Sequence, residues 1–486
     1  MGSESAGEST TLQSRKADHM NGRMGILLLA LGSAACAGGA AIDADASLTS
    51  RVEALVAPLL AANQFSGAIV LSRNDRVLYQ DGFGMANHSA GLPFTPDTPS
   101  DGASLAKTFT AAGVWSLVAE GRVGLDEPVT RYVPEYPHQQ TTVRQLLSHS
   151  NGLPAYYEFF DPYFTPDQVR TTQALLRVVA QQAPAPSFLP GTQFEYSNLG
   201  FDVAALMIER VTGQNYETFL KARFFSPLGM HDTFARPARL AEWRGVRTVG
   251  YRWRDSSWQP FDVFDMEAFL GASNLYFSAT DLGRWANANA TGSALPATVV
   301  TAGAQRSPID GKPSPITGLS WYCDNTGVRC YYTGSLNAFH SLVYWDRERG
   351  ESVALVTNST VPPWQVITLQ RNLVAALAGR PVRVDTTGPF MEFDDDTQVG
   401  AVGTYAAEEV GVVTVDAGPA GLALRVDCGL TFDMFRVARD VFYVPGADYW
   451  IAFGGGVLPA TMHLKSMFVE ATISRLPDRA AREACT

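Results

Sequence analysis

Ser104 and Lys107 form an S-x-x-K pattern at the start of an apolar stretch that is typical of a helix. A serine at a helix N-terminus has its hydroxyl beside unpaired backbone N–H groups and the positive end of the helix dipole. A lysine three residues later projects from the same face and can reach that hydroxyl. When buried, a lysine can lose its proton and act as a base, whereas an arginine cannot. The pair therefore indicates a serine nucleophile activated by an amine, or else an N-cap serine followed by a solvated lysine.

Two further segments favour the catalytic interpretation. Tyr196-Ser197-Asn198 is the only Y-x-N in the chain, and a phenol beside an ammonium can act as an acid or base while an amide holds a substrate carbonyl. Gly334 lies on an expected strand, where a glycine lets a substrate backbone approach closely, and the following Ser335 N–H can donate to an oxyanion. Lysine is scarce, with five residues against 32 arginines, so a lysine inside such a motif is less expected by chance.

With these three segments in this order, the sequence resembles the serine β-lactamase and penicillin-binding-protein-like hydrolases. It looks closest to the class C branch, which includes D-aminopeptidases, D-stereospecific carboxypeptidases and related esterases. Residues 104–107 match the family's S-x-x-K and residues 196–198 its Y-x-N. Residues 146–153, which contain His149, and residues 278–282 also look like stretches that recur in the family. The resemblance covers about residues 48–380.

The resemblance implies a role for each motif residue. Ser104 would be the acylated nucleophile, and Lys107 and Tyr196 would share the acid and base work. Asn198 would orient the substrate, while the backbone N–H groups of Ser104 and Ser335 would form the oxyanion hole. No metal and no organic cofactor is implied.

Tyr332 departs from the family pattern, because the third motif usually begins with lysine or histidine. Without a cation there, substrates that carry a carboxylate next to the scissile bond, such as β-lactams, are disfavoured, and a neutral ester or amide is favoured. Arg329, three residues earlier, could restore a positive charge. The sequence does not say which way that side chain points.

Other side chains near the motifs are open to two interpretations. The aromatic segment 155–164 is either a lid or wall for an apolar acyl group, with Glu158 or Asp161 facing an amine, or part of the packing of the helical lobe. His149 is expected to be structural rather than catalytic, because the chemistry already has its bases. His340 follows the third motif and is a candidate for lining the site.

The elements that must position these residues follow from hydrophobic periodicity. A helix is expected from Asp45 through Ala62 and another over Val366–Ala378, with a mainly helical region between about 104 and 300. Strands are expected at Gly67–Ser72, Arg76–Tyr79, Gly318–Tyr322, Arg329–Thr333, His340–Tyr344 and Ser352–Thr357. Strands at both ends with helices between them predict an α+β fold: one antiparallel sheet flanked by helices, with a helical lobe.

The chain is expected to divide into four parts. Residues 1–41 would be a polar tail with a probable signal segment, 48–380 the hydrolase domain, 381–398 a linker and 399–486 a small antiparallel β-barrel. Short strands separated by Gly, Pro and Asp predict that last domain, a sandwich or barrel by pattern alone. Its placement looks like the lipocalin-like β-domain that some family members carry.

The cysteines and the N-terminus bear on the compartment. Cys323 and Cys330 flank a turn and could pair across a hairpin, and Cys428 and Cys485 could form a second bridge, with buried free thiols as the alternative. Residues 20–41 have a positive charge, a short apolar run and small residues, the layout of a secretory signal. We expect export to the periplasm or extracellular space, where Cys36 could carry a lipid, with a cytoplasmic location as the alternative.

Composition limits the partners. The 486 residues carry a net charge of −11, and no Lys/Arg cluster is present, which argues against a nucleic-acid partner. No apolar run approaches the ~20 residues of a membrane helix, so no integral membrane segment is expected. The cysteines form no C-x-x-C pair beside a histidine cluster, so a zinc site is not expected. The oligomeric state is left open.

Three functions fit these observations. The first is a serine hydrolase that acts through an acyl-enzyme on small-molecule esters, amides or peptides. The second is an acyltransferase or peptide cyclase of the same family, in which an amine replaces water. The third is a catalytically silent binding or scaffold protein, which the intact Ser104, Lys107, Tyr196 and Asn198 argue against.

Overall fold

A computed structural model describes most of the chain. The described residues are 41–42, 46–153, 160–165, 167–263, 265, 267–361, 363–383, 402–407, 411–418, 421–426, 431–438, 441–444, 449–453, 461–465, 467 and 470–476. The α-helices are α1 (Leu48–Ala61), α2 (Ala106–Ala119), α3 (Val143–Leu147), α5 (Thr172–Gln182), α6 (Asn198–Thr212), α7 (Tyr216–Leu220), α8 (Ala279–Thr291), α9 (Ala297–Gly303) and α10 (Pro363–Leu377).

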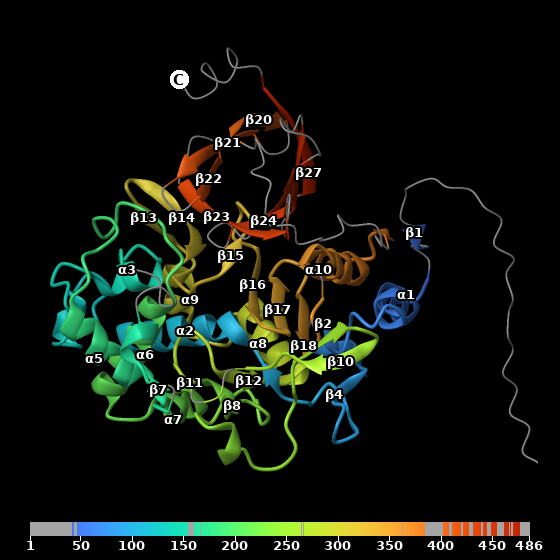
Figure 1. Ribbon diagram of the computed structural model, residues 1–486, viewed down its shortest axis with the longest axis horizontal. Helices are drawn as coiled ribbons and strands as arrows, with labels where there is room; N and C mark the ends of the chain where they lie inside the picture. The colour runs from blue at the N-terminus through green and yellow to red at the C-terminus, as the bar shows by residue number, and fades with distance from the viewer. Residues whose placement is uncertain are drawn as a thin grey trace, which may run out of the picture. The chain divides into compact units, whose positions relative to one another are not determined.

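An antiparallel sheet of eight strands joins the two ends of the segment 48–380 (Figure 1). In spatial order its strands are β13 (Arg306–Ile309), β14 (Lys312–Thr317), β15 (Tyr322–Cys323), β16 (Arg329–Leu336), β17 (Phe339–Asp346), β18 (Glu351–Thr357), β2 (Gly67–Arg73) and β3 (Arg76–Phe83). The N-terminal hairpin β2–β3 is therefore added to β18, with the pair Leu355 and Ile69 in register. The expected sheet built from both ends of this segment is confirmed.

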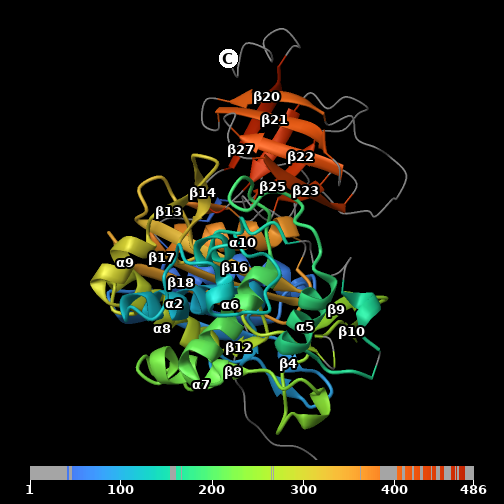
Figure 2. The same cartoon turned by 90° about the vertical axis from the view of Figure 1, so that its left-hand side faces the viewer.

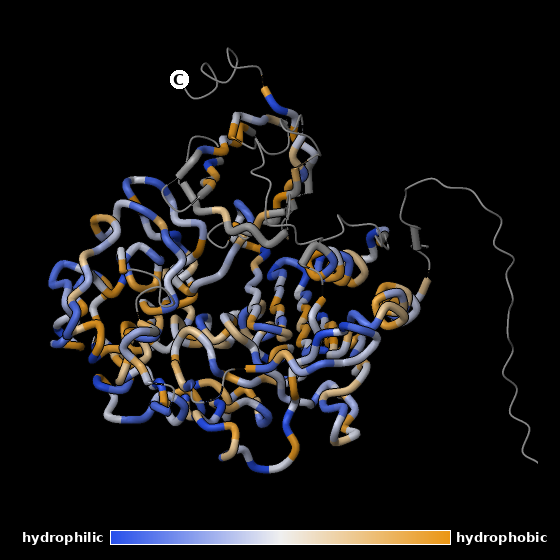
Figure 3. The backbone as a smooth tube through the Cα atoms, viewed as in Figure 1, coloured by the Kyte–Doolittle hydropathy of each residue, from blue (hydrophilic) through white to orange (hydrophobic). Residues whose placement is uncertain are grey.

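Helices cover both faces of this sheet. Successive strand residues point to opposite faces, so Val70 and Arg73 of β2 lie on different sides. A Cβ on Gly283 of α8 would lie 3.1 Å from Val70, whereas the Arg73 guanidinium donates to the carbonyl of Leu377 in α10. Helix α8 thus packs on one face and α10 on the other, where α1 accompanies it. Consistent with burial on two sides, all residues of β18 are buried, and hydrophobic (orange) and hydrophilic (blue) positions both occur along the sheet in Figure 3.

Smaller sheets complete the segment 48–380. A three-stranded sheet has the order β6 (Ser100–Asp101), β12 (Leu275–Phe277), β8 (Phe234–Ala235), and β6 leads directly into the turn that contains Ser104. The two-stranded sheets are β1 (Ala41–Ile42) with β19 (Val382–Arg383), β4 (Met85–Asn87) with β5 (Leu92–Pro93), β7 (Arg170–Thr171) with β11 (Glu267–Ala268), and β9 (Tyr251–Arg254) with β10 (Ser257–Pro260).

The sheet differs from the sequence expectation at its β13 edge. The expected strand Gly318–Tyr322 is wrong, because Ser320 has φ +65° and the Thr317 N–H donates to the Trp321 carbonyl, which closes a tight turn there. The pairing segments are instead β14 and β15. Strands β13 and β14 were not expected at all, since Pro308 and Pro313 obscure the strand pattern.

The C-terminal residues form a closed antiparallel barrel, which confirms that expectation (Figures 1 and 2). Its strands are β20 (Gly403–Ala407), β21 (Gly411–Gly418), β22 (Gly421–Val426), β23 (Thr431–Ala438), β24 (Val441–Val444), β25 (Tyr449–Phe453), β26 (Thr461–Lys465) and β27 (Glu470–Arg475). Pairing of Tyr405 with Arg475 closes the ring between β20 and β27. Likeness to a lipocalin stays a prediction.

One of the two expected disulfides is present. Cys323 of β15 and Cys330 of β16 face each other in register and are bonded. This bridge fixes the start of β16 two residues before Tyr332. Cys428 and Cys485 lie outside the described residues. Among the described helices, none combines the length and apolar character that a bilayer span needs.

Candidate active site

Ser104 lies in a short 3-10 turn, Ala103–Leu105, that runs directly into α2. The turn is held in an unusual conformation, because Ala103 has φ +46° and its N–H donates to Oδ1 of Asp101 at 2.7 Å. A residue other than glycine with positive φ is uncommon, and such strain is found where surrounding contacts impose it, often at active sites. Asp101 is fully buried, and burial raises the pKa of its carboxyl to about 6. Sequence reasoning did not identify Asp101.

Lys107 is fully buried one turn after Ser104. Its Nζ lies 3.2 Å from Ser104 Oγ and donates to the Ala272 carbonyl at 2.9 Å. The amine also lies over the rings of Tyr196, at 4.9 Å, and Phe201, at 5.8 Å. The structure therefore brings the serine, the lysine and the tyrosine of the first two motifs together, without an ion pair to the amine among the described residues.

Tyr196 immediately precedes α6, whose N-cap is Ser197. The His149 ring stacks on the Tyr196 ring with centroids 4.5 Å apart, and His149 Nδ1 accepts the Ser197 N–H at 3.0 Å. Burial and the nearby Lys107 lower the pKa of His149 well below its ordinary value, so the ring is neutral and carries its proton on Nε2. These contacts agree with the structural role expected for His149, as a support for Tyr196.

Strand β16 contributes Tyr332 and Gly334, which share one face because strand residues alternate. A Cβ on Gly334 would lie 2.1 Å from the Gly102 carbonyl oxygen, so only glycine permits this close approach of β16 to the turn that contains Ser104. Ser341 of β17 adds a hydrogen bond from its hydroxyl to the same carbonyl, at 2.7 Å. Gly334 therefore matters as a packing position beside Ser104.

Tyr332 points at Tyr196. Their hydroxyl oxygens are 3.4 Å apart, and the Tyr332 ring, 1 % exposed, lies 5.6 Å from that of Tyr322. Arg329 lies on the other face of β16 and its guanidinium binds Asp324 at 2.7 Å in the adjoining turn. Arg329 thus does not supply the cation that Tyr332 lacks.

Asn198 and Ser335 border this group. Asn198 is the first residue of α6, partly exposed, and within the described part of the chain its side chain makes no hydrogen bond. Ser335 is exposed, and its hydroxyl lies 3.1 Å from Nδ1 of His340, whose pKa is lowered to about 4 by burial. The substrate-orienting and oxyanion roles of Asn198 and Ser335 stay predictions.

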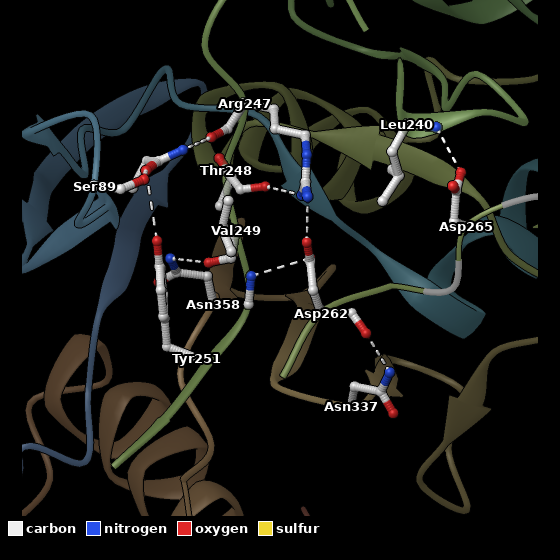
Figure 4. Close-up of polar contacts among 12 residues, drawn as sticks. Ser89, Leu240, Arg247, Thr248, Val249, Tyr251, Asp262, Asp265, Asn337 and Asn358 are labelled. Atoms are coloured by element: carbon white, nitrogen blue, oxygen red, sulfur yellow. Dashed lines mark hydrogen bonds and ion pairs between the residues drawn. The ribbon is translucent and has the colours of Figure 1, made fainter. Parts of the chain in front are cut away.

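The turn after β16 is anchored by a polar network (Figure 4). Asn337, in the β16–β17 turn, donates to the carbonyl of Asp262, whose carboxylate forms an ion pair with Arg247 and accepts the Gly250 N–H. Asn358, directly after β18, donates to the Val249 carbonyl at 2.8 Å. The segment between Arg247 and Asp262 thus ties together the ends of the strands beside the site.

The aromatic segment after His149 is described only in part. Residues 154–159, including Glu158, lie outside the described residues, whereas Phe160 is 3 % exposed and belongs to the core. Asp161 begins a short turn that ends at Tyr163. The lid hypothesis therefore stays a prediction.

Comparison with known proteins finds relatives of this chain. The model of the family described as Beta-lactamase matches residues 52–378. Penicillin-binding protein 4* of Bacillus subtilis is 31 % identical over 179 residues, which are 37 % of this chain and 40 % of that protein. Esterase EstB of Burkholderia gladioli is 31 % identical over 271 residues, 49 % of this chain and 69 % of the esterase. The match to the first relative thus spans less than half of its length.

A solved class C β-lactamase shares the fold. It superposes with a TM-score of 0.55 at 22 % identity, covering 68 % of this chain and 96 % of that enzyme.

Proposed function

The chain belongs to the beta-lactamase family of serine hydrolases, and on that premise we propose that it hydrolyses neutral esters or small amides through an acyl-enzyme at Ser104. The 3.2 Å separation of Lys107 Nζ and Ser104 Oγ supports this mechanism, because it allows direct proton transfer from the hydroxyl. Burial of Lys107 beside Tyr196 supports a shared acid and base role for the two groups.

The proposed reaction has two steps, acylation of Ser104 and hydrolysis of the acyl-enzyme. Ser104 Oγ attacks the carbonyl carbon, its proton passes to Lys107 or Tyr196, and the bond to the alcohol or amine breaks as that group receives a proton. Water then attacks the carbonyl carbon of the acyl-serine and gives up a proton to Lys107 or Tyr196. The bond from that carbon to Ser104 Oγ breaks as Oγ receives a proton, which releases the acid and restores the serine hydroxyl. The N–H groups of Ser104 and Ser335 are proposed to stabilise the oxyanion of each tetrahedral intermediate.

The position of Tyr332 is the observation from which we infer that the substrates are neutral. Its uncharged phenol meets Tyr196 where the family motif begins with lysine or histidine. A substrate carboxylate beside the scissile bond would find no cation in this place, and leaving a charge unpaired on binding is costly. The likeness to an esterase supports the same assignment.

A matched pair of substrates tests this proposal. 4-Nitrophenyl butyrate and the 4-nitrophenyl hemiester of succinate differ mainly in a terminal carboxylate. We expect kcat/KM to favour the butyrate by about tenfold or more, since a charge that loses its hydration without gaining a partner weakens transition-state binding. Equal values, or a preference for the succinate, would reject the neutral-substrate class.

We also propose that the protein acts outside the cytoplasm. The Cys323–Cys330 disulfide supports this location, because such bonds persist mainly in oxidising compartments. Mass spectrometry of the protein from fractionated native cells tests it: export predicts a processed N-terminus and two fewer thiol hydrogens at this pair. A full-length, reduced protein in the cytosolic fraction would contradict it.

A further inference from the structure

Asp202 of α6 is a buried carboxyl that the mechanism above does not use. Its side chain is fully enclosed, Oδ1 accepts the Ala272 N–H at 3.0 Å, and Oδ2 has no hydrogen-bond partner among the described residues. A buried carboxyl without a full set of partners destabilises a fold unless something offsets it. Its position therefore calls for an explanation.

Ala272 connects this carboxyl to the nucleophile. The N–H of Ala272 is held by Asp202, and its carbonyl accepts from Lys107 Nζ at 2.9 Å. Asp202, Ala272, Lys107 and Ser104 thus form one continuous series of hydrogen bonds. The N–H and the carbonyl of Ala272 belong to two neighbouring planar peptide groups. The φ and ψ angles of Ala272 relate these two groups, so a hydrogen bond that holds the N–H also limits the direction of the carbonyl.

The segment that carries Ala272 is held against the helices on both sides. Gly271 has φ +113°, and a Cβ there would lie 2.3 Å from the Phe201 carbonyl oxygen of α6, so glycine is needed for this approach. From α2, the Thr110 hydroxyl bonds to the Gly271 carbonyl at 2.6 Å and contacts the Tyr216 hydroxyl. The hydrogen bond from the Ala272 N–H to Asp202 is the contact that orients the backbone of Ala272 itself.

We propose that Asp202 is a positioning residue for Lys107, acting through Ala272 in the acylation reaction proposed above, on which this inference rests. When Lys107 is neutral, its amine has two N–H bonds and one lone pair. A carbonyl fixed at 2.9 Å takes one N–H and leaves the lone pair free to turn toward Ser104 Oγ, 3.2 Å away. Loss of the Asp202 contact frees the carbonyl and therefore misaligns the base.

The charge environment indicates how Asp202 acts. The titratable groups that face it are Lys107 from α2, Tyr216 from α7 and Glu267 from β11. Burial raises the pKa of Asp202 well above its ordinary value, despite the nearby amine. In its contact with Ala272 the carboxyl is a hydrogen-bond acceptor through Oδ1, and asparagine, which keeps an acceptor at Oδ1, can replace it there.

Three variants test the proposal: Asp202→Asn, Asp202→Ala, and Asp281→Asn as a matched control. Asp281 of α8 is also a fully buried carboxyl that accepts a backbone N–H, from Asp232 at 2.8 Å, but it is not in the series that reaches Ser104. The readouts are the rate of labelling by an activated fluorophosphonate, kcat and KM for a neutral nitrophenyl ester, and hydrogen exchange of residues 268–275. Thermal melting checks that each variant folds.

We expect Asp202→Ala to slow labelling by about tenfold to a hundredfold, with a lower kcat, a KM within about threefold and faster exchange at Ala272. Asp202→Asn and Asp281→Asn should stay within about threefold of wild type, because neither removes the acceptor that aligns Ala272. If Asp202→Ala does not fold, Asp202→Leu, which has the same branching but no hydrogen-bond acceptor, should show the same kinetic loss.

Wild-type labelling in a folded Asp202→Ala or Asp202→Leu would overturn the inference alone. Labelling of Asp202→Asn as slow as that of Asp202→Ala would also overturn the inference, because asparagine keeps the acceptor at Oδ1. A wild-type protein that the fluorophosphonate does not label at Ser104 would instead reject the proposed function itself, and this inference with it.

Discussion

Lys107 Nζ lies 3.2 Å from Ser104 Oγ although the lysine side chain is completely buried. Burying an amine is unfavourable unless its N–H groups find acceptors. Here the Ala272 carbonyl and the two aromatic rings of Tyr196 and Phe201 surround it. This placement brings Ser104, the proposed nucleophile, together with the proposed acid and base groups Lys107 and Tyr196. Five predictions test the proposed mechanism and the packing that supports it.

The first prediction concerns the chemistry of Lys107. Lys107→Met keeps most of the buried volume without the amine, and Lys107→Arg keeps a charge that cannot be lost. Both should slow fluorophosphonate labelling of Ser104 by about a hundredfold or more, because the proton acceptor is gone. Circular dichroism shows whether the variants fold. An arginine variant that retains more than a tenth of the wild-type rate would argue against lysine as the base.

The second prediction concerns Tyr332. Tyr332→Phe removes only the hydroxyl that meets Tyr196, so hydrolysis of neutral esters should change by about threefold or less. Tyr332→Lys places a cation beside the site and should raise kcat/KM for the succinate hemiester by about tenfold relative to the butyrate. If Tyr332→Lys leaves the ratio of the two substrates unchanged, Tyr332 does not face the substrate carboxylate position.

The third prediction concerns the close approach of β16 to the nucleophile turn. A Cβ at position 334 would lie 2.1 Å from the Gly102 carbonyl oxygen, and backbone cannot yield as a flexible side chain does. Gly334→Ala should therefore lower the free energy of unfolding by about 2 kcal/mol or more and reduce Ser104 labelling. Thr333→Val, next along the strand on its other face, is the control. An active and fully stable Gly334→Ala would show that the two segments are not packed this closely.

The fourth prediction concerns the disulfide. Cys323 and Cys330 are separated by seven positions, and closing so short a loop is expected to contribute about 2–3 kcal/mol. In the double variant Cys323→Ser with Cys330→Ser, the free energy of unfolding measured in urea should be lower by about 2–3 kcal/mol. Because β16 carries Tyr332 shortly after the bridge, KM should rise more than kcat falls. Unchanged urea unfolding would mean that the bridge does not constrain the unfolded chain.

The fifth prediction concerns acid stability. Burial and Lys107 lower the pKa of His149 well below the 6.5 of an unfolded histidine. The unfolded chain then binds a proton that the folded chain does not, so stability is complete above pH 6.5 and falls as pH drops toward the lower folded pKa. The slope from this group is about 1.4 kcal/mol per pH unit inside that window. Urea unfolding at pH 7, 6 and 5 measures it, and His149→Gln should flatten the dependence. An equal slope in that variant would assign the acid sensitivity to other groups.

Local sequence predicts the parts of the site that depend on local structure. Ser104 and Lys107 are three residues apart on one helix, so their contact follows from helix geometry. Cys323 and Cys330 flank a turn signal, which offered a disulfide across a hairpin beside the alternative of free thiols, and the structure contains the disulfide. The strand that carries Tyr332 follows from its apolar and aromatic composition.

Contacts between distant segments could not be predicted in this way. Asp202 is a single acidic residue without a motif, and its importance depends on Ala272, 70 positions away, which contributes only backbone groups. Arg329 is turned away from Tyr332 because strand residues alternate between faces and the β15–β16 turn supplies Asp324 as its partner. The β13–β14 hairpin was missed because its prolines suppress the usual strand signal.

The most direct test of the central claim is intact mass spectrometry after incubation with an activated fluorophosphonate, on wild type and on Ser104→Ala. The account predicts one phosphonyl adduct on the wild type, located at Ser104 by peptide mapping, and none on a folded Ser104→Ala. Parallel incubation with a penicillin should give no stable adduct on either protein. An unlabelled wild type, or an adduct that persists in Ser104→Ala, would contradict the assignment of Ser104 as the nucleophile.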